Sequence, residues 1–174
     1  MHSLLRDSIT HRTRNSWHST LHLLETNSRA TDPALQQHYV LIIGTDSSAD
    51  LYDPSTQSFA RVGSLPPGIG GTGNTASLRD DGTVLVAGGF RLVLCQLSIN
   101  AAASNITAAL FTPESDGFTV TASLNTPRDT HTATVLQDGT VVVVGGILHQ
   151  AFIEGFDKCL GRGLHALSSA ELFK

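Results

Sequence analysis

Short apolar runs alternate along this chain with clusters of Gly, Pro, Asp and Ser, at a spacing typical of strands. The stretch "HTATVL" (His131–Leu136) alternates apolar and polar residues, and "TVVVVGG" (Thr140–Gly146) reads as a buried strand. An Asp-Gly pair separates them, which favours a two-residue hairpin turn with positive φ at both positions. The pattern therefore predicts an antiparallel β-hairpin over residues 131–146.

The same hairpin is written twice, as "LRDDGTVLVAGG" (Leu78–Gly89) and "LQDGTVVVVGG" (Leu136–Gly146). Two more short strands are predicted in each unit, because Ser48–Pro66 aligns with Thr107–Asn125. A third copy begins at "SSAELF" (Ser168–Phe173), which repeats "SSADLY". Upstream, "VLIIGT" at 40–45 takes the place of "VLVAGG", and "HSTLHLL" at 18–24 faintly echoes "HTATVLQ". Four antiparallel strands per unit describe the blade of a β-propeller.

The repeated residues resemble kelch repeats, in particular those of galactose-oxidase-like propellers, over about Val40 to Lys174. Two departures from that pattern are Phe at the second aromatic position, which is often Trp, and Gly71 and Asn74 where the second copy has Arg128 and His131. The resemblance implies an all-β fold of kelch-type blades, with "HTATVL" innermost and "FTVTASL" outermost. The structural repeat residues are Tyr52, Phe59, Asp81, Gly82, Gly88, Gly89, Phe111, Phe118, Arg128, His131, Asp138, Gly139, Gly145 and Gly146.

We expect an irregular or degraded N-terminal segment over 1–36 and a propeller arc over 37–174. Its repeat units lie near 48–89 and 107–146, and a third starts at 168. Irregular inserts are expected at 25–37, 90–104 and 147–167. This amounts to an incomplete propeller of about two to three blades, whereas propellers close with roughly four to eight. Either the chain is a piece of a longer protein, which its ending inside a blade favours, or several arcs join and self-associate through open blade edges.

Composition narrows the partners. With 174 residues, a net charge of -4 and 15% charged residues, the chain suits one domain without a basic stripe, so nucleic acid is not expected. No apolar run reaches the roughly 18 residues that span a bilayer, and the N-terminus lacks the apolar core of a signal peptide. We expect a soluble protein, cytoplasmic by default and without membrane contact. Cys95 and Cys159 lack metal-ligand spacing and are expected to be free buried thiols, and we discount the glycosylation sequon at Asn105.

Few residues suggest chemistry. "GIGGTG" at 68–73 matches a dinucleotide fingerprint literally, but a predicted strand follows it instead of a helix, so a loop is expected. His18 and His22 lack a paired Cys, Asp or Glu at ligand spacing. Arg128 and His131 are expected to form a buried network between blades, with ligand contact as the alternative. Asp81 and Asp138 are assigned to turns. We assign no catalytic, cofactor-binding or metal-binding residue and expect no cofactor.

The resemblance implies a non-catalytic binding or scaffold module, engaged in protein–protein interaction through blade loops, with the inserts after Gly89 and Gly146 as recognition elements. Two alternatives remain. One is a carbohydrate-binding propeller. The other is part of a copper radical enzyme similar to galactose oxidase or glyoxal oxidase, which needs two tyrosines, two histidines and a cysteine at one metal. The chain has only Tyr39 and Tyr52, and Tyr52 serves the repeat, so we expect no enzyme.

Overall fold

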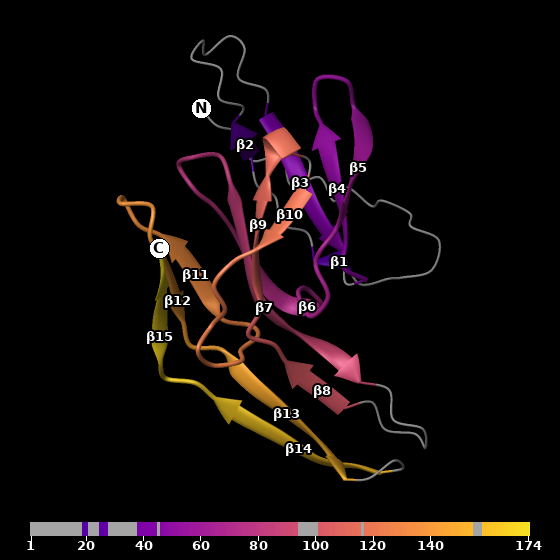
Figure 1. Cartoon of the computed structure of the whole chain (residues 1–174), viewed down its shortest axis with the longest axis vertical. Helices are drawn as coiled ribbons and strands as arrows, with labels where there is room; N and C mark the ends of the chain where they lie inside the picture. The colour runs from indigo at the N-terminus through magenta and orange to yellow at the C-terminus, as the bar shows by residue number, and fades with distance from the viewer. Residues whose placement is uncertain are drawn as a thin grey trace, which may run out of the picture.

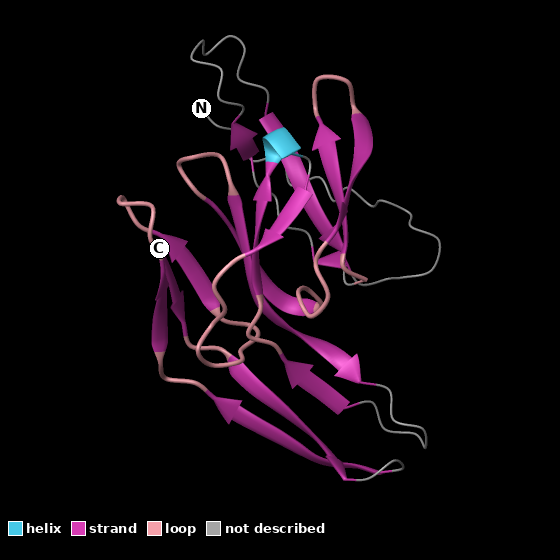
Figure 2. Cartoon of the chain, viewed as in Figure 1, coloured by secondary structure: helices cyan, strands magenta, loops and turns pink. Residues whose placement is uncertain are grey.

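The computed structural model describes residues 19–20, 25–27, 38–44, 46–93, 101–115, 117–154 and 158–174. This part of the chain is all-β, as the sequence predicts, and its strands pair in antiparallel sheets (Figure 2). One 3₁₀ turn, Pro113–Ser115, is the only helical element among these residues. The abundance of Val, Thr and Gly, together with the turn residues between apolar runs, explains why strands and not helices form.

The middle sheet has the strand order expected for a complete unit. Its path runs β10-β9-β7-β6, all antiparallel, and β8 pairs with the far end of β7. The β6–β7 hairpin therefore comes first in the sequence and forms one side of the sheet, and β9 and β10 follow it in order. The bounds are Thr72–Leu78 for β6, Val84–Val93 for β7, Ala101–Ser104 for β8, Ala108–Thr112 for β9 and Gly117–Val120 for β10.

The sheets on either side repeat this order. The first runs β1-β3-β4-β5 with β2 paired to β3, and the third runs β11-β12-β15. The first-sheet strands are β1 (Ser19–Thr20), β2 (Glu25–Asn27), β3 (His38–Gly44), β4 (Ser48–Asp53) and β5 (Ser58–Ser64). The third-sheet strands are β11 (Thr132–Val135), β12 (Val141–Val144) and β15 (Ala170–Phe173). One complete unit thus lies between a preceding unit and three strands of another, as the sequence predicts.

Both faces of the middle sheet are buried. Alternate residues of β7 point to opposite faces, and each face packs against a neighbouring sheet. Val84 and Val86 pack with Phe111 against residues of the first sheet such as Leu41. Leu85 and Ala87 belong to a second cluster with Val141, Val143 and Phe173 of the third sheet. Figure 1 shows the three sheets side by side in this order. Two apolar layers therefore hold the three sheets together.

The two inserts that follow glycine pairs are regular hairpins, so the prediction that they are irregular is wrong. After Gly89, β7 continues to Val93 and pairs with β8; after Gly146, β13 (Ile147–Glu154) pairs with β14 (Lys158–Ala166). Both hairpins leave from the same end of their sheets, and β8 lies beside β13 (Figure 1). Within each hairpin the two strands satisfy their backbone polar groups by pairing with one another, which a long irregular loop would not achieve.

The Asp-Gly turns also differ from the prediction. Only Gly82 and Gly139 have positive φ, at 82° and 80°, and neither aspartate does. In the first loop the Gly82 N–H donates to the Arg79 carbonyl, and the Thr83 carbonyl accepts from the Arg79 N–H. The second loop has the same two bonds, between Gly139 and Leu136 and between Leu136 and Thr140. This is a three-residue loop with a glycine bulge. The aspartate acts through its side chain: Asp81 Oδ1 accepts from Thr83 N at 3.0 Å, and Asp138 Oδ1 from Thr140 N at 3.0 Å.

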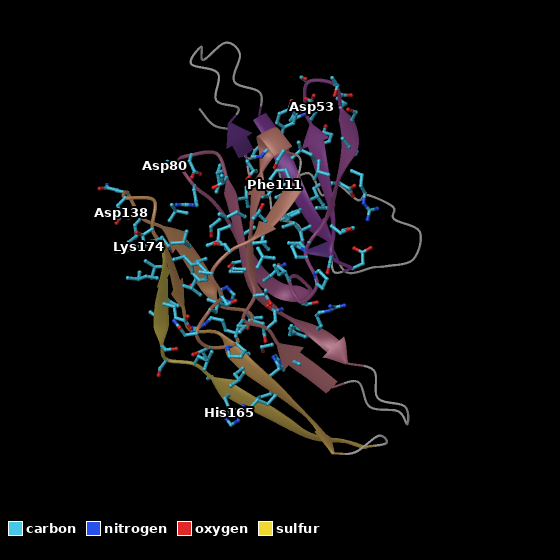
Figure 3. The ribbon with its side chains drawn as sticks, in the orientation of Figure 1. Asp53, Asp80, Phe111, Asp138, His165 and Lys174 are labelled. Atoms are coloured by element: carbon cyan, nitrogen blue, oxygen red, sulfur yellow. The ribbon has the colours of Figure 1, made fainter. Side chains whose placement is uncertain are left out.

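The paired aromatic residues are cross-strand neighbours. Phe111 and Phe118 stand opposite each other on β9 and β10, with ring centroids 5.2 Å apart, and Phe111 is fully buried between the first and middle sheets (Figure 3). Tyr52 and Phe59 pair in the same way at 4.7 Å. Tyr52 alternates with Leu51, which faces the middle sheet, so this pair lies on the opposite face. The Tyr52–Phe59 pair therefore does not pack between the first and middle sheets.

Candidate functional site at the sheet junction

The connector from β10 to β11 crosses the end of β7, and glycines make room for it. A Cβ on Gly88 would lie 2.5 Å from the Arg128 carbonyl oxygen, and one on Gly146 would lie 2.6 Å from the Asp129 carbonyl oxygen. The Gly89 N–H donates to the Arg128 carbonyl at 3.0 Å. All four paired glycines, 88, 89, 145 and 146, have positive φ. The glycine pairs therefore position the polar segment Arg128–His131 between the middle and third sheets.

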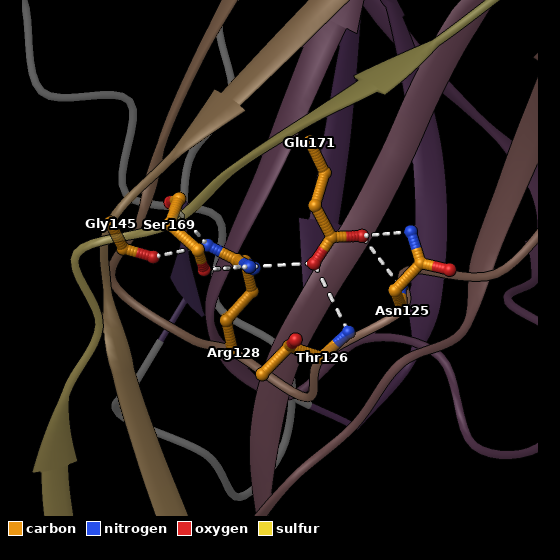
Figure 4. Close-up of polar contacts among 6 residues, drawn as sticks. All are labelled: Asn125, Thr126, Arg128, Gly145, Ser169 and Glu171. Atoms are coloured by element: carbon orange, nitrogen blue, oxygen red, sulfur yellow. Dashed lines mark hydrogen bonds and ion pairs between the residues drawn. The ribbon is translucent and has the colours of Figure 1, made fainter.

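Arg128 is fully buried and binds the third sheet (Figure 4). Its Nη1 donates to the Gly145 carbonyl at 2.7 Å and to the Ser169 carbonyl at 3.2 Å. Its Nη2 donates to Ser169 Oγ at 3.0 Å and pairs with Glu171 Oε1 at 2.6 Å. A buried guanidinium needs such a set of acceptors, because an unpaired charge there costs several kcal/mol, of the order of 3 to 5.

Glu171 extends this network to the connector. Its carboxylate accepts from the N–H groups of Asn125 and Thr126, so one side chain on β15 holds both the connector backbone and Arg128 (Figure 4). Burial by itself raises the pKa of Glu171, but the hydrogen bonds from Asn125, Arg128 and Thr126 outweigh it, and the pKa lies below its usual value. The carboxylate is therefore ionised opposite Arg128 at neutral pH.

His131 links the connector to the inner strand of the middle sheet. Its Nε2 lies 2.8 Å from the hydroxyl of Thr75 on β6, and the residue is only 5% exposed. Burial and, next, the Arg128 charge lower the pKa of His131 to about 4, against the opposing effect of Asp129 and Glu171. The imidazole is therefore neutral at pH 7. Arg128 and His131 together connect the two sheets, as the predicted buried network requires.

Asp129 forms a third polar cluster, at the base of the two hairpins. Its Oδ2 accepts from Ser104 Oγ and contacts His149 Nδ1, both at 2.6 Å. Ser104 Oγ also accepts from the His149 backbone N–H at 2.8 Å, and the His149 ring lies against Phe90 at 5.0 Å. Asp129 is fully buried. One carboxylate thus joins the connector, β8 and β13.

This combination of Ser, His and Asp is not arranged as a nucleophilic triad. A triad needs the histidine to accept the serine proton while the carboxylate orients the opposite ring nitrogen. Here Ser104 and His149 contact the same oxygen of Asp129, so the hydroxyl donates to the carboxylate and not to the imidazole. What this geometry does chemically is fix three backbone segments with charge-assisted hydrogen bonds.

The remaining candidate residues lie apart from this junction or outside the described residues. Within the described part of the chain, no group of three or more His, Cys, Asp or Glu side chains is arranged to hold a metal ion. The 68–73 stretch forms the connector into β6, a strand, and Gly70 O accepts from Asn105 Nδ2 at 3.3 Å. Asn105, the sequon residue, is therefore part of this packing. His18, His22, Cys95 and the Cys159 side chain lie outside the described residues.

Sequence reasoning missed several junction residues. Asp129 lies inside the quoted repeat motif, between Arg128 and His131, so its position could have drawn attention to it. Glu171 is the third-copy counterpart of Asp50 and Ala109. Because the other copies have different residues at this position, the repeat pattern did not indicate an ion pair between Glu171 and Arg128. His149 and Ser104 lie in the inserts, where the repeat offers no comparison. Only the three-dimensional structure brings these two residues to Asp129.

Comparison of the sequence with protein-family models finds no match, and comparison with curated proteins finds none either. The described residues include no helix with the length and apolar character required to cross a bilayer.

Proposed function

We propose that this chain is a non-catalytic binding or scaffold module of kelch-type blades, part of a larger propeller, that engages a protein partner through its paired hairpins. The observation that carries this proposal is the hydrogen-bonded joint between the two hairpins at Asp129, Ser104 and His149. Recognition elements built on a rigid scaffold present their side chains without a large ordering cost on binding.

The composition of the exposed hairpin surface supports a protein partner. Leu164 on β14 is 64% exposed. Its neighbours are exposed as well, namely His165, which is labelled in Figure 3, and Ala166. In contrast, Arg128, Asp129 and His131 are buried and hydrogen-bonded to the fold. The buried polar residues thus stabilise the fold, whereas the hairpin exposes the apolar Leu164 and Ala166 and the imidazole of His165 to a partner.

The test uses the full chain with a charge on the hairpin surface. We expect Leu164→Asp to leave the fold intact, because Leu164 is mostly exposed. We also expect the variant to lose the capture of proteins that the wild-type chain binds in cell extract. Leu136→Asp is the matched control, since Leu136 is 43% exposed in the β11–β12 loop, away from the hairpins. Captured proteins are then purified and titrated calorimetrically, with at least about tenfold weaker binding expected for Leu164→Asp. Equal binding by all three chains would refute the hairpin as the recognition element.

A further inference from the structure

The third sheet shares one feature with the middle sheet and lacks another. Its register is the same as in the middle sheet: Val141 pairs with Phe173 as Val84 pairs with Phe111, and Val142 pairs with Leu172 as Leu85 pairs with Leu110. In the middle and first sheets, a fourth strand then pairs with the third. Among the described residues, β15 pairs with β12 alone.

The fourth strands that are present share a pattern. Phe59 lies opposite Tyr52, and Phe118 lies opposite Phe111. Six residues after each phenylalanine comes a leucine, Leu65 or Leu124. In this fold the phenylalanine of a fourth strand is therefore followed, six residues later and beyond the end of the strand, by a leucine.

Both leucines are anchored in the same way. Leu65 and Leu124 are 4% and 2% exposed. Their N–H groups donate to the carbonyls of Ser47 and Ile106, at 2.8 and 2.7 Å. Each of these acceptors stands five residues before the aromatic residue of the third strand. In the third sheet Phe173 and Ser168 occupy these two positions.

The face that such a leucine would cover is exposed in the third sheet. Leu124 belongs to the cluster that contains Ala87 and Ala108, which are 1% and 0% exposed. By register, their counterparts are Val144, which is 46% exposed, and Ala170, which is also exposed. Leu172 is 64% exposed, whereas its counterpart Leu110 packs against the cluster. An apolar face of this kind on an open strand edge is a site for strand addition.

We infer that the outer edge of β15 is a strand-acceptor site that binds, antiparallel, an extended segment carrying Phe and Leu six residues apart. The phenylalanine lies opposite Phe173. The leucine N–H donates to the carbonyl of Ser168, and its side chain covers Val144 and Ala170. The inference rests on the repeated architecture in the proposed function and concerns a different surface from the hairpins, so variants at Leu164 and Leu172 test the two separately.

The probe is a fluorescent peptide with the sequence of residues Pro113–Leu124, "PESDGFTVTASL", titrated into the full chain. We expect saturable binding by fluorescence anisotropy and slower amide hydrogen exchange at Ala170–Phe173. A scrambled peptide, and peptides with Phe118→Ser or Leu124→Asp, are expected to bind at least about tenfold more weakly. On the chain, Leu172→Asp should weaken binding similarly, and Leu136→Asp should not.

Several outcomes would overturn the inference. These are the absence of saturable binding, equal binding of the scrambled peptide, protection elsewhere than in β15, and an unaffected Leu172→Asp chain. Self-association that protects β15 in the absence of peptide would show that a second copy of the chain occupies this edge. That result would also overturn the inference that the edge binds a separate segment with Phe and Leu six residues apart. Circular dichroism of Leu172→Asp serves as the folding control, and because the substituted side chain is exposed, the spectrum should be unchanged.

Discussion

Buried polar residues at the sheet junction show how hydrogen bonds and an ion pair accommodate charge inside the fold. Arg128 and Asp129 are consecutive and both fully buried, yet each has its own hydrogen-bond partner, Glu171 for Arg128 and His149 for Asp129. Neighbouring His131 differs because its contact is the neutral hydroxyl of Thr75, and its Nδ1 has no hydrogen-bond partner among the described residues. Protonating His131 would therefore place a second positive charge and an unpaired donor next to Arg128, in a buried environment.

This environment predicts acid sensitivity. The pKa of His131 falls from 6.5 to about 4 on folding, so between these pH values the unfolded chain binds a proton that the folded chain does not. Stability should therefore decrease as pH falls through this window, by at most about 1.4 kcal/mol per pH unit, and be independent of His131 above it. Urea unfolding of the wild type and His131→Gln from about pH 4 to about pH 7 checks this. Identical pH slopes in the two chains would contradict it.

At the scale of elements, repetition made the strands predictable and concealed their connections. Period-two alternation and the two aligned copies identify β6, β7, β9 and β10 correctly, because each copy supports the other. The turn geometry was wrong because Asp-Gly fits both a two-residue turn and a longer loop with a glycine bulge. The hairpin after Gly89 was missed because "FRLVLCQLSI" contains no Gly, Pro, Asn or Asp to mark a turn. Side-chain contacts such as that between Asp129 and His149 join segments that are distant in the sequence, so the local pattern of apolar and polar residues could not predict them.

The glycine pairs provide a prediction at this scale. Gly88→Ala should unfold more easily than Gly139→Ala, although both glycines have positive φ, at 67° and 80°. An added Cβ at Gly88 meets the Arg128 carbonyl and the His131 ring, whereas at Gly139 nothing lies within 4 Å. Both variants bear the left-handed cost of about 1–2 kcal/mol, and Gly88→Ala should lose roughly 1–3 kcal/mol more. Urea denaturation measures the difference; equal losses would show that the connector moves aside freely.

At the scale of the whole molecule, the middle sheet determines how the three sheets depend on one another. Its two faces belong to different apolar clusters, one shared with the first sheet and one with the third. Neither outer sheet needs to touch the other for its stability to depend on the other. Because a strand such as β7 contributes Val86 to one cluster and Leu85 to the other, loosening either face should weaken the whole sheet.

This arrangement predicts that the described sheets unfold as one cooperative unit. Val143→Ala removes buried apolar volume from the third sheet and should cost about 1–3 kcal/mol. Both tyrosines of the chain, Tyr39 and Tyr52, lie in the first sheet, so fluorine-labelled tyrosine reports on that sheet alone. If the middle sheet couples its neighbours, the urea midpoint of the tyrosine signals shifts in Val143→Ala as much as the midpoint of far-UV circular dichroism. An unchanged tyrosine midpoint would mean that the third sheet unfolds independently and that the repeat unit, not the chain, is the folding unit.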